Sequence, residues 1–173
     1  MKLQEIDKAT YRFRLNRIII AFVVGFAVLA IIFGSVLIAL FGDVQVGDEP
    51  VNNFRFNLMG VILGLIVSGA VLNKLKNSAF FNEVFYVWQL KQIHNLIYRK
   101  QKKIEAAAKE GDINAFIVLN YYYQTLLQVY KLDDNTLTLS NVHAKQAELD
   151  EQMAARNVSI STEQFNKEMI SAF

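Results

Sequence analysis

Two long apolar stretches dominate the hydrophobic pattern of the chain. Residues 18–41 read IIIAFVVGFAVLAIIFGSVLIALF and contain no charged side chain. A helix of this length extends about 36 Å, which is enough to cross the roughly 30 Å hydrocarbon core of a bilayer. The second apolar stretch, 58–72, reaches spanning length only as part of a helix over 54–75. We predict a membrane-spanning helix over 18–41, a second over 54–75, and an outside loop over 42–53.

The charges around these stretches favour two crossings over one. Residues 1–17 carry five Lys or Arg against two acidic residues, and 73–103 carry seven against one, whereas the connector 42–57 carries three acidic residues and one Arg. Because basic flanks stay on the cytoplasmic side, both termini are expected inside and the connector outside. A second stretch that merely lay in the interface would leave one basic flank outside. The first stretch is too long for a cleaved signal peptide and is expected to be an uncleaved anchor.

Small residues mark one face of the second span. Gly60, Gly64 and Ser68 recur every four residues, which is the spacing that lets two membrane helices approach closely. Two uses remain open. The face can pack against the first span, whose Ala21/Gly25 and Ala30/Gly34 have the same spacing, or it can join two copies of the chain.

The polar C-terminal part predicts further helices. Apolar periodicity and capping signals place them at about 79–109, 113–131, 140–156 and 162–170. Asp112 is expected to cap the second of these helices, and Ser161 with Gln164 forms a capping-box start for the last. The first either continues span two or is separated from it by a break capped at Asn77–Ser78. The predicted fold is therefore all-α: an N-terminal lead over 1–17, a transmembrane hairpin over 18–75, and a cytoplasmic bundle of about four helices over 76–173.

The predicted helix 113–131 is apolar nearly all round and needs cover on several sides. Its antiparallel neighbour can cover one side; the rest requires the C-terminal helices, a second subunit or the bilayer surface. Tyr121, Tyr122 and Leu126 form the candidate partner surface. The three successive tyrosines over 121–123 point about 100° apart, so at least one is expected in the core.

No residue pattern indicates a catalytic, cofactor or metal site. His94 and His143 lack a second metal-ligating side chain at helical spacing, and there is no Gly-rich phosphate loop or nucleophile elbow. The chain has no cysteine, and the two apolar stretches contain no ionisable residue of the kind that ion-coupled carriers use.

A basic cluster in the predicted helix 79–109 is the strongest charged feature. It comprises Arg99, Lys100, Lys102 and Lys103, which are candidates for contact with anionic lipid. A solvated helix face is the plainer interpretation. Nucleic acid is not an expected partner, because the net charge is only +2 and no nucleic-acid-binding motif is present.

Several segments resemble a known family. They are MKLQEIDKATYRFRLNR at the start, NFRFNLMGVILGL at span two, VFYVWQLKQIHNLIYRKQKKI, and LDDNTLTL. The chain up to about Asp150 resembles a small gammaproteobacterial two-span inner-membrane family that is catalogued only as a domain of unknown function. The resemblance implies a bacterial inner-membrane setting and brings no catalytic residue, ligand or activity with it.

We therefore expect a non-enzymatic, membrane-anchored interaction or scaffold protein that has no cofactor. Its expected partners are the lipid bilayer and either a second copy of the chain or another protein. One alternative is a small oligomeric pore or transport accessory assembled through Gly60, Gly64 and Ser68. The other is an enzyme acting on lipid at the membrane face, which needs a polar cleft near Asn95, Arg99 and Tyr98.

Overall fold

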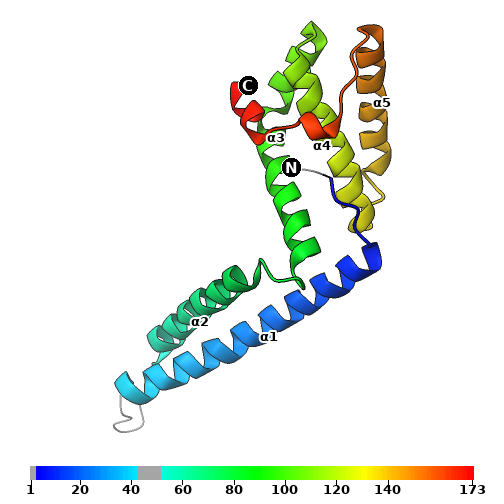
Figure 1. Ribbon diagram of the computed structural model, residues 1–173. Coiled ribbons are helices and arrows are strands. Elements are labelled where there is room, and N and C mark those ends of the chain that lie inside the picture. Colours follow the sequence, from blue (N-terminus) through cyan, green and yellow to red (C-terminus); the bar gives the residue numbers. More distant parts are fainter. Residues whose placement is uncertain (1–2, 43–51) are drawn as a thin grey trace. The chain divides into compact units, whose positions relative to one another are not determined.

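The computed structural model describes residues 3–42 and 52–173, and these residues form helices and turns without any strand. Most of the predicted outside loop, 43–51, lies outside the described residues. The all-α prediction is confirmed. The elements are α1 (Lys8–Phe41), α2 (Phe54–Leu75), α3 (Asn82–Glu110), α4 (Ile113–Leu132), α5 (Leu139–Ala155) and two short 3₁₀ helices, η1 (Thr162–Gln164) and η2 (Lys167–Ala172) (Figure 1).

The chain divides into two compact units. The helical domain consists of the described part of Met1–Arg12 together with Glu83–Phe173, and the hairpin unit is Phe13–Asn82. The start of the chain therefore groups with the C-terminal helices rather than with the hairpin unit.

Helix α1 begins ten residues before the predicted span. Asp7 caps it, since its Oδ1 accepts a hydrogen bond from the backbone N–H of Thr10 (2.8 Å) and its carbonyl oxygen accepts from that of Tyr11 (3.0 Å). An aspartate side chain at this position pairs one of the free N–H groups at a helix start. The predicted polar lead is thus helical from Lys8 onward.

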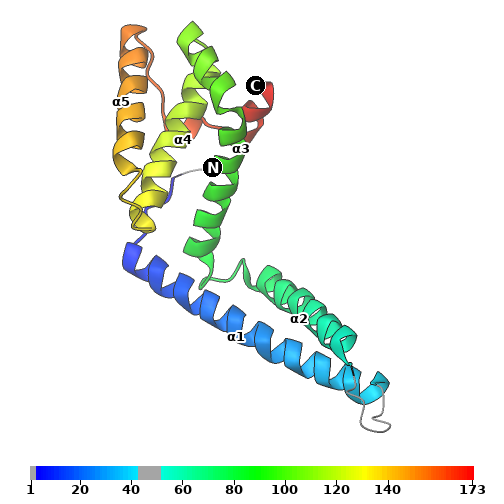
Figure 2. The same ribbon diagram turned by 180° about the vertical axis from the view of Figure 1, so that it is seen from behind.

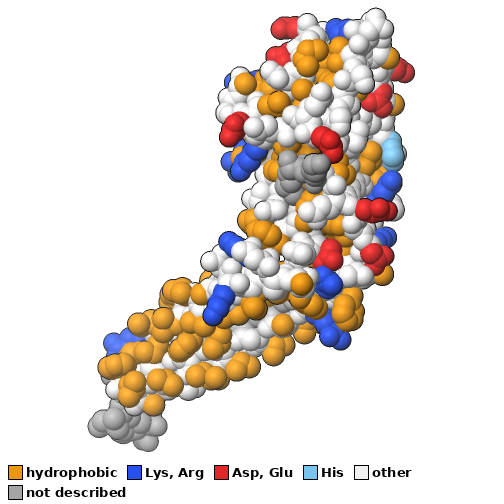
Figure 3. Space-filling view, viewed as in Figure 1, with side chains coloured by type: hydrophobic (Ala, Val, Ile, Leu, Met, Phe, Trp, Pro, Cys, Tyr) orange, Lys and Arg blue, Asp and Glu red, His pale blue; other side chains and the backbone are white. Residues whose placement is uncertain are grey.

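Helices α1 and α2 are long and apolar enough to cross a membrane. Only 6% of the most apolar window of α1 and 17% of that of α2 is buried, whereas a core helix of a water-soluble protein would be mostly buried. Exposed apolar side chains such as Ile31 (68% exposed) and Ile66 (62%) cover the hairpin (Figure 3). Such an extended apolar surface is what a lipid environment accommodates.

The two helices of the hairpin unit run side by side in both views (Figures 1 and 2). Gly60 faces the backbone of α1: a Cβ at this position would lie 2.4 Å from the Gly34 nitrogen and 2.8 Å from the Ala30 carbonyl oxygen. A Cβ on Gly64 would lie 2.9 Å from the Ala30 nitrogen. The small-residue face, with buried Ser68 on its continuation, therefore packs within the hairpin. This arrangement matches the first of the two uses that the sequence leaves open.

Helix α2 ends at Leu75 and is not continuous with α3. Residues 76–81 form turns in which the Ser78 N–H donates to the Leu75 carbonyl oxygen and the Phe81 N–H donates to that of Ser78, both at 2.9 Å. The break falls at the predicted Asn77–Ser78 position.

The core of the helical domain is centred on α4, which lies between α3 and α5 in both views (Figures 1 and 2). Asp112 caps its start as predicted, accepting from the N–H groups of Asn114 (2.7 Å) and Ala115 (3.2 Å). The cover that this apolar helix requires comes from α3, α5 and the C-terminal segment. Of the alternatives, the C-terminal elements are therefore the ones that the structure uses.

The last predicted helix, 162–170, is wrong in type. Ser161 and Gln164 form the predicted capping box, but it starts only the short η1. Phe165 is extended and buried, and the Asn166 side chain caps η2 by accepting from the Glu168 N–H at 3.2 Å. The extended Phe165 interrupts the helix because it turns its ring onto that of Tyr121, with ring centroids 3.8 Å apart.

Candidate functional site

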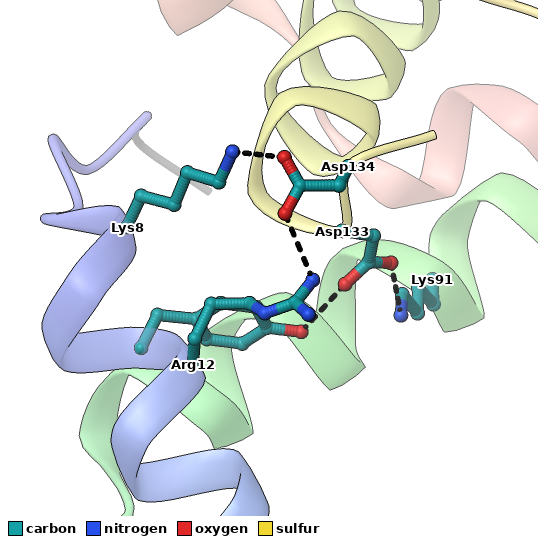
Figure 4. Close-up of polar contacts among 6 residues, drawn as sticks. Lys8, Arg12, Lys91, Asp133 and Asp134 are labelled. Carbon is teal, nitrogen blue, oxygen red and sulfur yellow. Dashed lines mark hydrogen bonds and ion pairs between the residues drawn. The ribbon is translucent and has the colours of Figure 1, made fainter. Parts of the chain in front are cut away.

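The N-terminal segment, residues 3–12, is held against the helical domain by a buried tyrosine. Tyr11 is 1% exposed, and its hydroxyl donates to Oδ1 of Asp133 at 3.0 Å, while Lys91 on α3 pairs with Oδ2 of Asp133 at 2.7 Å (Figure 4). Burial raises the pKa of the Tyr11 hydroxyl above its ordinary value, and the neighbouring Asp133 charge raises it further. Tyr11 therefore stays neutral and donates over the whole physiological range.

Asp134 adds two ion pairs at the same turn. It pairs with Lys8 and, at 3.2 Å, with Arg12, both on the first turns of α1 (Figure 4). The hydrogen bond from Lys8 lowers the pKa of the Asp134 carboxyl. Because these side chains are about half exposed and the charges are screened by solvent, each pair adds little stability. They orient the segment, whereas the buried Tyr11 supplies most of the attachment.

The other end of the segment is attached at Gln4. The backbone N–H of Gln4 donates to the Tyr86 hydroxyl at 3.0 Å, and Gln128 donates to the Gln4 carbonyl oxygen at 2.6 Å. The sequence alone indicates only a solvated turn at Asp133 and Asp134 and does not indicate this docking role. The available signal was the spacing of Lys8, Tyr11 and Arg12, which share one face of a helix.

The predicted partner surface is buried by the chain itself. Tyr121, Tyr122 and Leu126 are 0%, 6% and 9% exposed. Tyr121 stacks on Phe165, and Tyr122 meets the His94 ring edge to face with centroids 5.6 Å apart. In the described structure these three side chains are therefore buried within the helical domain and do not form an exposed surface. The expectation that at least one tyrosine faces the core is met by all of them.

His94 is a buried structural histidine. Its Nε2 lies 2.8 Å from Oγ1 of Thr125, and this hydroxyl donates to the Tyr121 carbonyl oxygen at 2.7 Å. Because threonine has a single hydroxyl hydrogen, Nε2 of His94 is the donor in the first bond. His143 lies exposed on α5. Among residues 3–42 and 52–173 there is no group of three or more His, Cys, Asp or Glu side chains able to hold a metal ion.

The burial of His94 makes stability depend on pH. Burial lowers its pKa from 6.5 to about 4, so between these values the unfolded chain binds a proton that the folded chain does not. Stability is therefore complete above about pH 7 and falls as the pH drops toward 4. We expect a loss of about 2 kcal/mol between pH 7 and 5. Chemical unfolding of the full chain in detergent, followed through its only tryptophan, Trp88, measures this loss.

His94→Gln is the matched control, because its amide does not titrate. The lowered pKa values of Asp7, Asp134 and Glu105 affect both proteins alike at the acidic end. An equal decrease in the two proteins between pH 7 and 5 would show that His94 is not the source.

The predicted lipid-contacting cluster lies on α3. Arg99, Lys102 and Lys103 are exposed, whereas Lys100 is half-buried and donates to the Ile170 carbonyl oxygen at 2.9 Å. All four line a groove of about 520 Å³ together with Tyr98, Gln101, Glu105 and Lys145. Lys100 therefore fastens the C-terminal segment, and the other three cations remain at the surface.

A second groove, which we call the α3 groove, lies between α3 and the C-terminal segment and has a volume of about 710 Å³. Trp88, 53% exposed, stands in its lining on α3, and Phe165 and Lys167 line it from the C-terminal segment. Its other lining residues are Gln89, Gln92, Ile93, Asn95, Leu96, Arg99 and Asn166. The lining combines amide, aromatic and cationic groups and contains no carboxylate, histidine or hydroxyl group. It suits binding of an anionic or apolar group better than proton transfer.

The polar cleft required by a lipid-directed enzyme is present only in part. Asn95 and Arg99 line the α3 groove. Tyr98, 69% exposed, does not line it, and lies instead in the groove of about 520 Å³ formed by the basic cluster. The three residues therefore do not converge on one cleft.

Comparison with known proteins gives one match. No curated protein and no solved structure matches the chain. Residues 1–170, nearly the whole length, match the sequence profile of a family described as "Protein of unknown function (DUF3087)". The chain therefore belongs to the DUF3087 family of proteins of unknown function.

Proposed function

We propose that this protein is a two-span protein of the bacterial inner membrane whose helical domain acts as a non-enzymatic scaffold in the cytoplasm. On this proposal α1 and α2 cross the bilayer, and both termini lie on the cytoplasmic side. The helical domain binds another protein through the α3 groove. No described contact favours a pore or a lipid-directed enzyme over this proposal.

The docked N-terminal segment is the observation that carries the proposal. Residues 3–12 precede the first apolar stretch, and Glu83–Phe173 follow the second. Tyr11 is nevertheless buried against Glu83–Phe173, where its hydroxyl donates to Asp133. Two segments in contact must lie on the same side of a bilayer. An even number of crossings between them satisfies this requirement, so the contact supports the hairpin topology independently of hydropathy.

The charges assign the side. Arg14 and Arg17 flank the start of the first apolar stretch, and Lys74 and Lys76 flank the end of the second. Because basic flanks remain in the cytoplasm, this arrangement places the helical domain there.

The α3 groove replaces the buried tyrosines as the proposed partner surface. It presents an exposed tryptophan, Trp88, and an exposed arginine, Arg99, which are residue types that dominate binding energy at protein interfaces. Lys167 adds a second positive charge to the lining. A partner segment with acidic and apolar side chains fits this chemistry.

Site-specific photo-crosslinking in native membranes tests the proposal. A photoreactive amino acid in place of Trp88 is expected to give a discrete protein adduct, identified by mass spectrometry. The same amino acid in place of Leu137, which is 92% exposed and lies outside the groove lining, should not give that adduct. Arg99→Glu should abolish the Trp88 adduct by reversing the groove charge. An adduct of twice the chain mass indicates self-association through the groove, and an adduct unaffected by Arg99→Glu contradicts the proposed surface.

A further inference from the structure

We propose that the hairpin unit binds one anionic phospholipid, with an acyl chain in a groove between α1 and α2 and the phosphate at Arg17. This inference rests on the proposed function, because it requires the hairpin to lie in a bilayer. It names a ligand for the hairpin, whereas the partner surface proposed above belongs to the helical domain.

The hairpin groove has a volume of about 380 Å³, within the range of about 300–1,000 Å³ that is typical of ligand pockets. From α1 it is lined by Arg17, Ile18, Ala21, Phe22, Gly25 and Leu29, and from α2 and the turn after it by Ser68, Val71, Leu72, Leu75, Phe80 and Phe81. Arg17 and Ser68 are the only polar residues in this lining. The groove is therefore suited to a hydrocarbon chain that carries a polar group at one end.

The groove exists because some glycines of the hairpin lie against the backbone of the other helix, whereas Gly25 does not. Near Gly60 and Gly64 the backbones touch, and an added Cβ would collide with α1. At Gly25 a Cβ would meet nothing within 4 Å, so the missing side chain there leaves open space. The helices are thus in close contact at one end and leave a hollow at the end that carries Arg17.

The length of the groove matches one leaflet of a bilayer. From Arg17 to Leu29 the helix rises about 18 Å, and half of the hydrocarbon core is about 15 Å. A groove that begins at the charged edge of the span and ends near the bilayer centre follows the path of a single acyl chain.

The charge at the open end selects an anionic headgroup. Arg17 is exposed and its guanidinium lies 4.3 Å from the centre of the Phe13 ring, which holds it in place. Two further cations belong to the same unit. Arg14, one helical turn before Arg17, donates to the Ala79 carbonyl oxygen at 2.9 Å, and Lys74 lies on the last turn of α2. The described part of Phe13–Asn82 contains no acidic residue. Arginine recognises phosphate through two parallel N–H bonds, and the local positive charge favours a lipid with net negative charge.

Lipid retention by the purified full-length chain tests this inference, and the chain offers a matched pair of glycines. The chain is freed of lipid in detergent, incubated with phosphatidylglycerol or diacylglycerol, and examined by native mass spectrometry. Wild type should retain one phosphatidylglycerol and little diacylglycerol. Gly25→Leu should reduce retention of phosphatidylglycerol about tenfold or more, because the leucine fills the groove.

Gly69→Leu is the control, since a Cβ at Gly69 also meets nothing within 4 Å but this residue does not line the groove. It should retain phosphatidylglycerol like wild type. Arg17→Gln should lower phosphatidylglycerol retention about tenfold without changing that of diacylglycerol. Arg17→Gln keeps the groove shape and removes only its charge, so it tests the inference if Gly25→Leu fails to fold.

Three results overturn the lipid site: equal retention of the two lipids by wild type, full retention by Gly25→Leu, or equal losses in Gly25→Leu and Gly69→Leu. Extraction of membranes with alkaline carbonate separates this failure from that of the proposed function. Wild type that stays in the membrane but binds no phosphatidylglycerol removes the lipid site alone. Wild type that carbonate releases removes the proposed function together with the lipid site.

Discussion

Replacing Gly60 with leucine is expected to separate the two helices of the hairpin. A Cβ at this position would lie 2.4 Å from the Gly34 nitrogen, 2.6 Å from the Gly34 Cα and 2.8 Å from the Ala30 carbonyl oxygen. All three are backbone atoms, so no side-chain rotation relieves the overlap and the helices must move apart. We expect a destabilisation of about 1–3 kcal/mol, because close packing contributes much of the attraction between helices in lipid.

The separation can be measured as a distance. Spin labels on Ile20→Cys and Val71→Cys, both on exposed positions of the hairpin, report the spacing of α1 and α2. Gly60→Leu should lengthen and broaden the distance distribution, whereas Gly69→Leu, which adds the same side chain in open space, should leave it unchanged. An unchanged distribution in Gly60→Leu would contradict the backbone contact.

Replacing Tyr11 with alanine is expected to release the N-terminal segment from the helical domain. Tyr11 is almost fully buried, and removing a buried aromatic ring costs about 3–5 kcal/mol. The exposed pairs of Lys8 and Arg12 with Asp134 are too weak to compensate. Limited trypsin digestion of the full chain should therefore cut after Lys8 and Arg12 in this variant and leave wild type intact.

Two further variants separate the ring from the charges. Tyr11→Phe keeps the ring and removes only the hydroxyl that donates to Asp133, so it should cost about 1 kcal/mol and keep the segment protected. Arg12→Gln removes an exposed ion pair and should also remain protected. Release by Arg12→Gln without release by Tyr11→Ala would contradict the dominant role of the buried ring.

Features governed by local sequence were predictable. The bounds of α2 follow from an apolar stretch between a polar loop and Lys74, and the sequence permits the break at Asn77–Ser78 that the structure contains. The start of α4 follows from the Asp112 cap, since this cap needs only backbone groups two and three residues away. The need for cover on several sides of α4 also follows from its composition, and the C-terminal elements supply that cover.

Features governed by contacts between distant residues were not predictable. The docking of Tyr11 on Asp133 joins residues more than a hundred positions apart. The shared helix face of Lys8, Tyr11 and Arg12 indicates a contact but does not identify Asp133 as the partner. The burial of Tyr121 and Tyr122 depends on Phe165, whose extended backbone breaks the helix expected there. The hollow beside Gly25 was not predictable, because Gly25 and Gly34 each follow an alanine at the same spacing in the sequence. Only the packing of α1 on α2 distinguishes them: Asn57 lies close to Gly34, and nothing lies within 4 Å of a Cβ on Gly25.

The accessibility of single cysteines tests the two-span topology most directly, and the chain permits this experiment because it has no native cysteine. Glu5→Cys, Asn52→Cys and Leu137→Cys place one thiol at an exposed position before α1, between α1 and α2, and within the helical domain. The full chain is produced in a bacterial host, and spheroplasts are treated with a membrane-impermeant maleimide before and after lysis. A two-span topology with both termini in the cytoplasm predicts labelling of Asn52→Cys in intact spheroplasts, and of Glu5→Cys and Leu137→Cys only after lysis. Labelling of Glu5→Cys and Leu137→Cys from opposite sides of the membrane would contradict it.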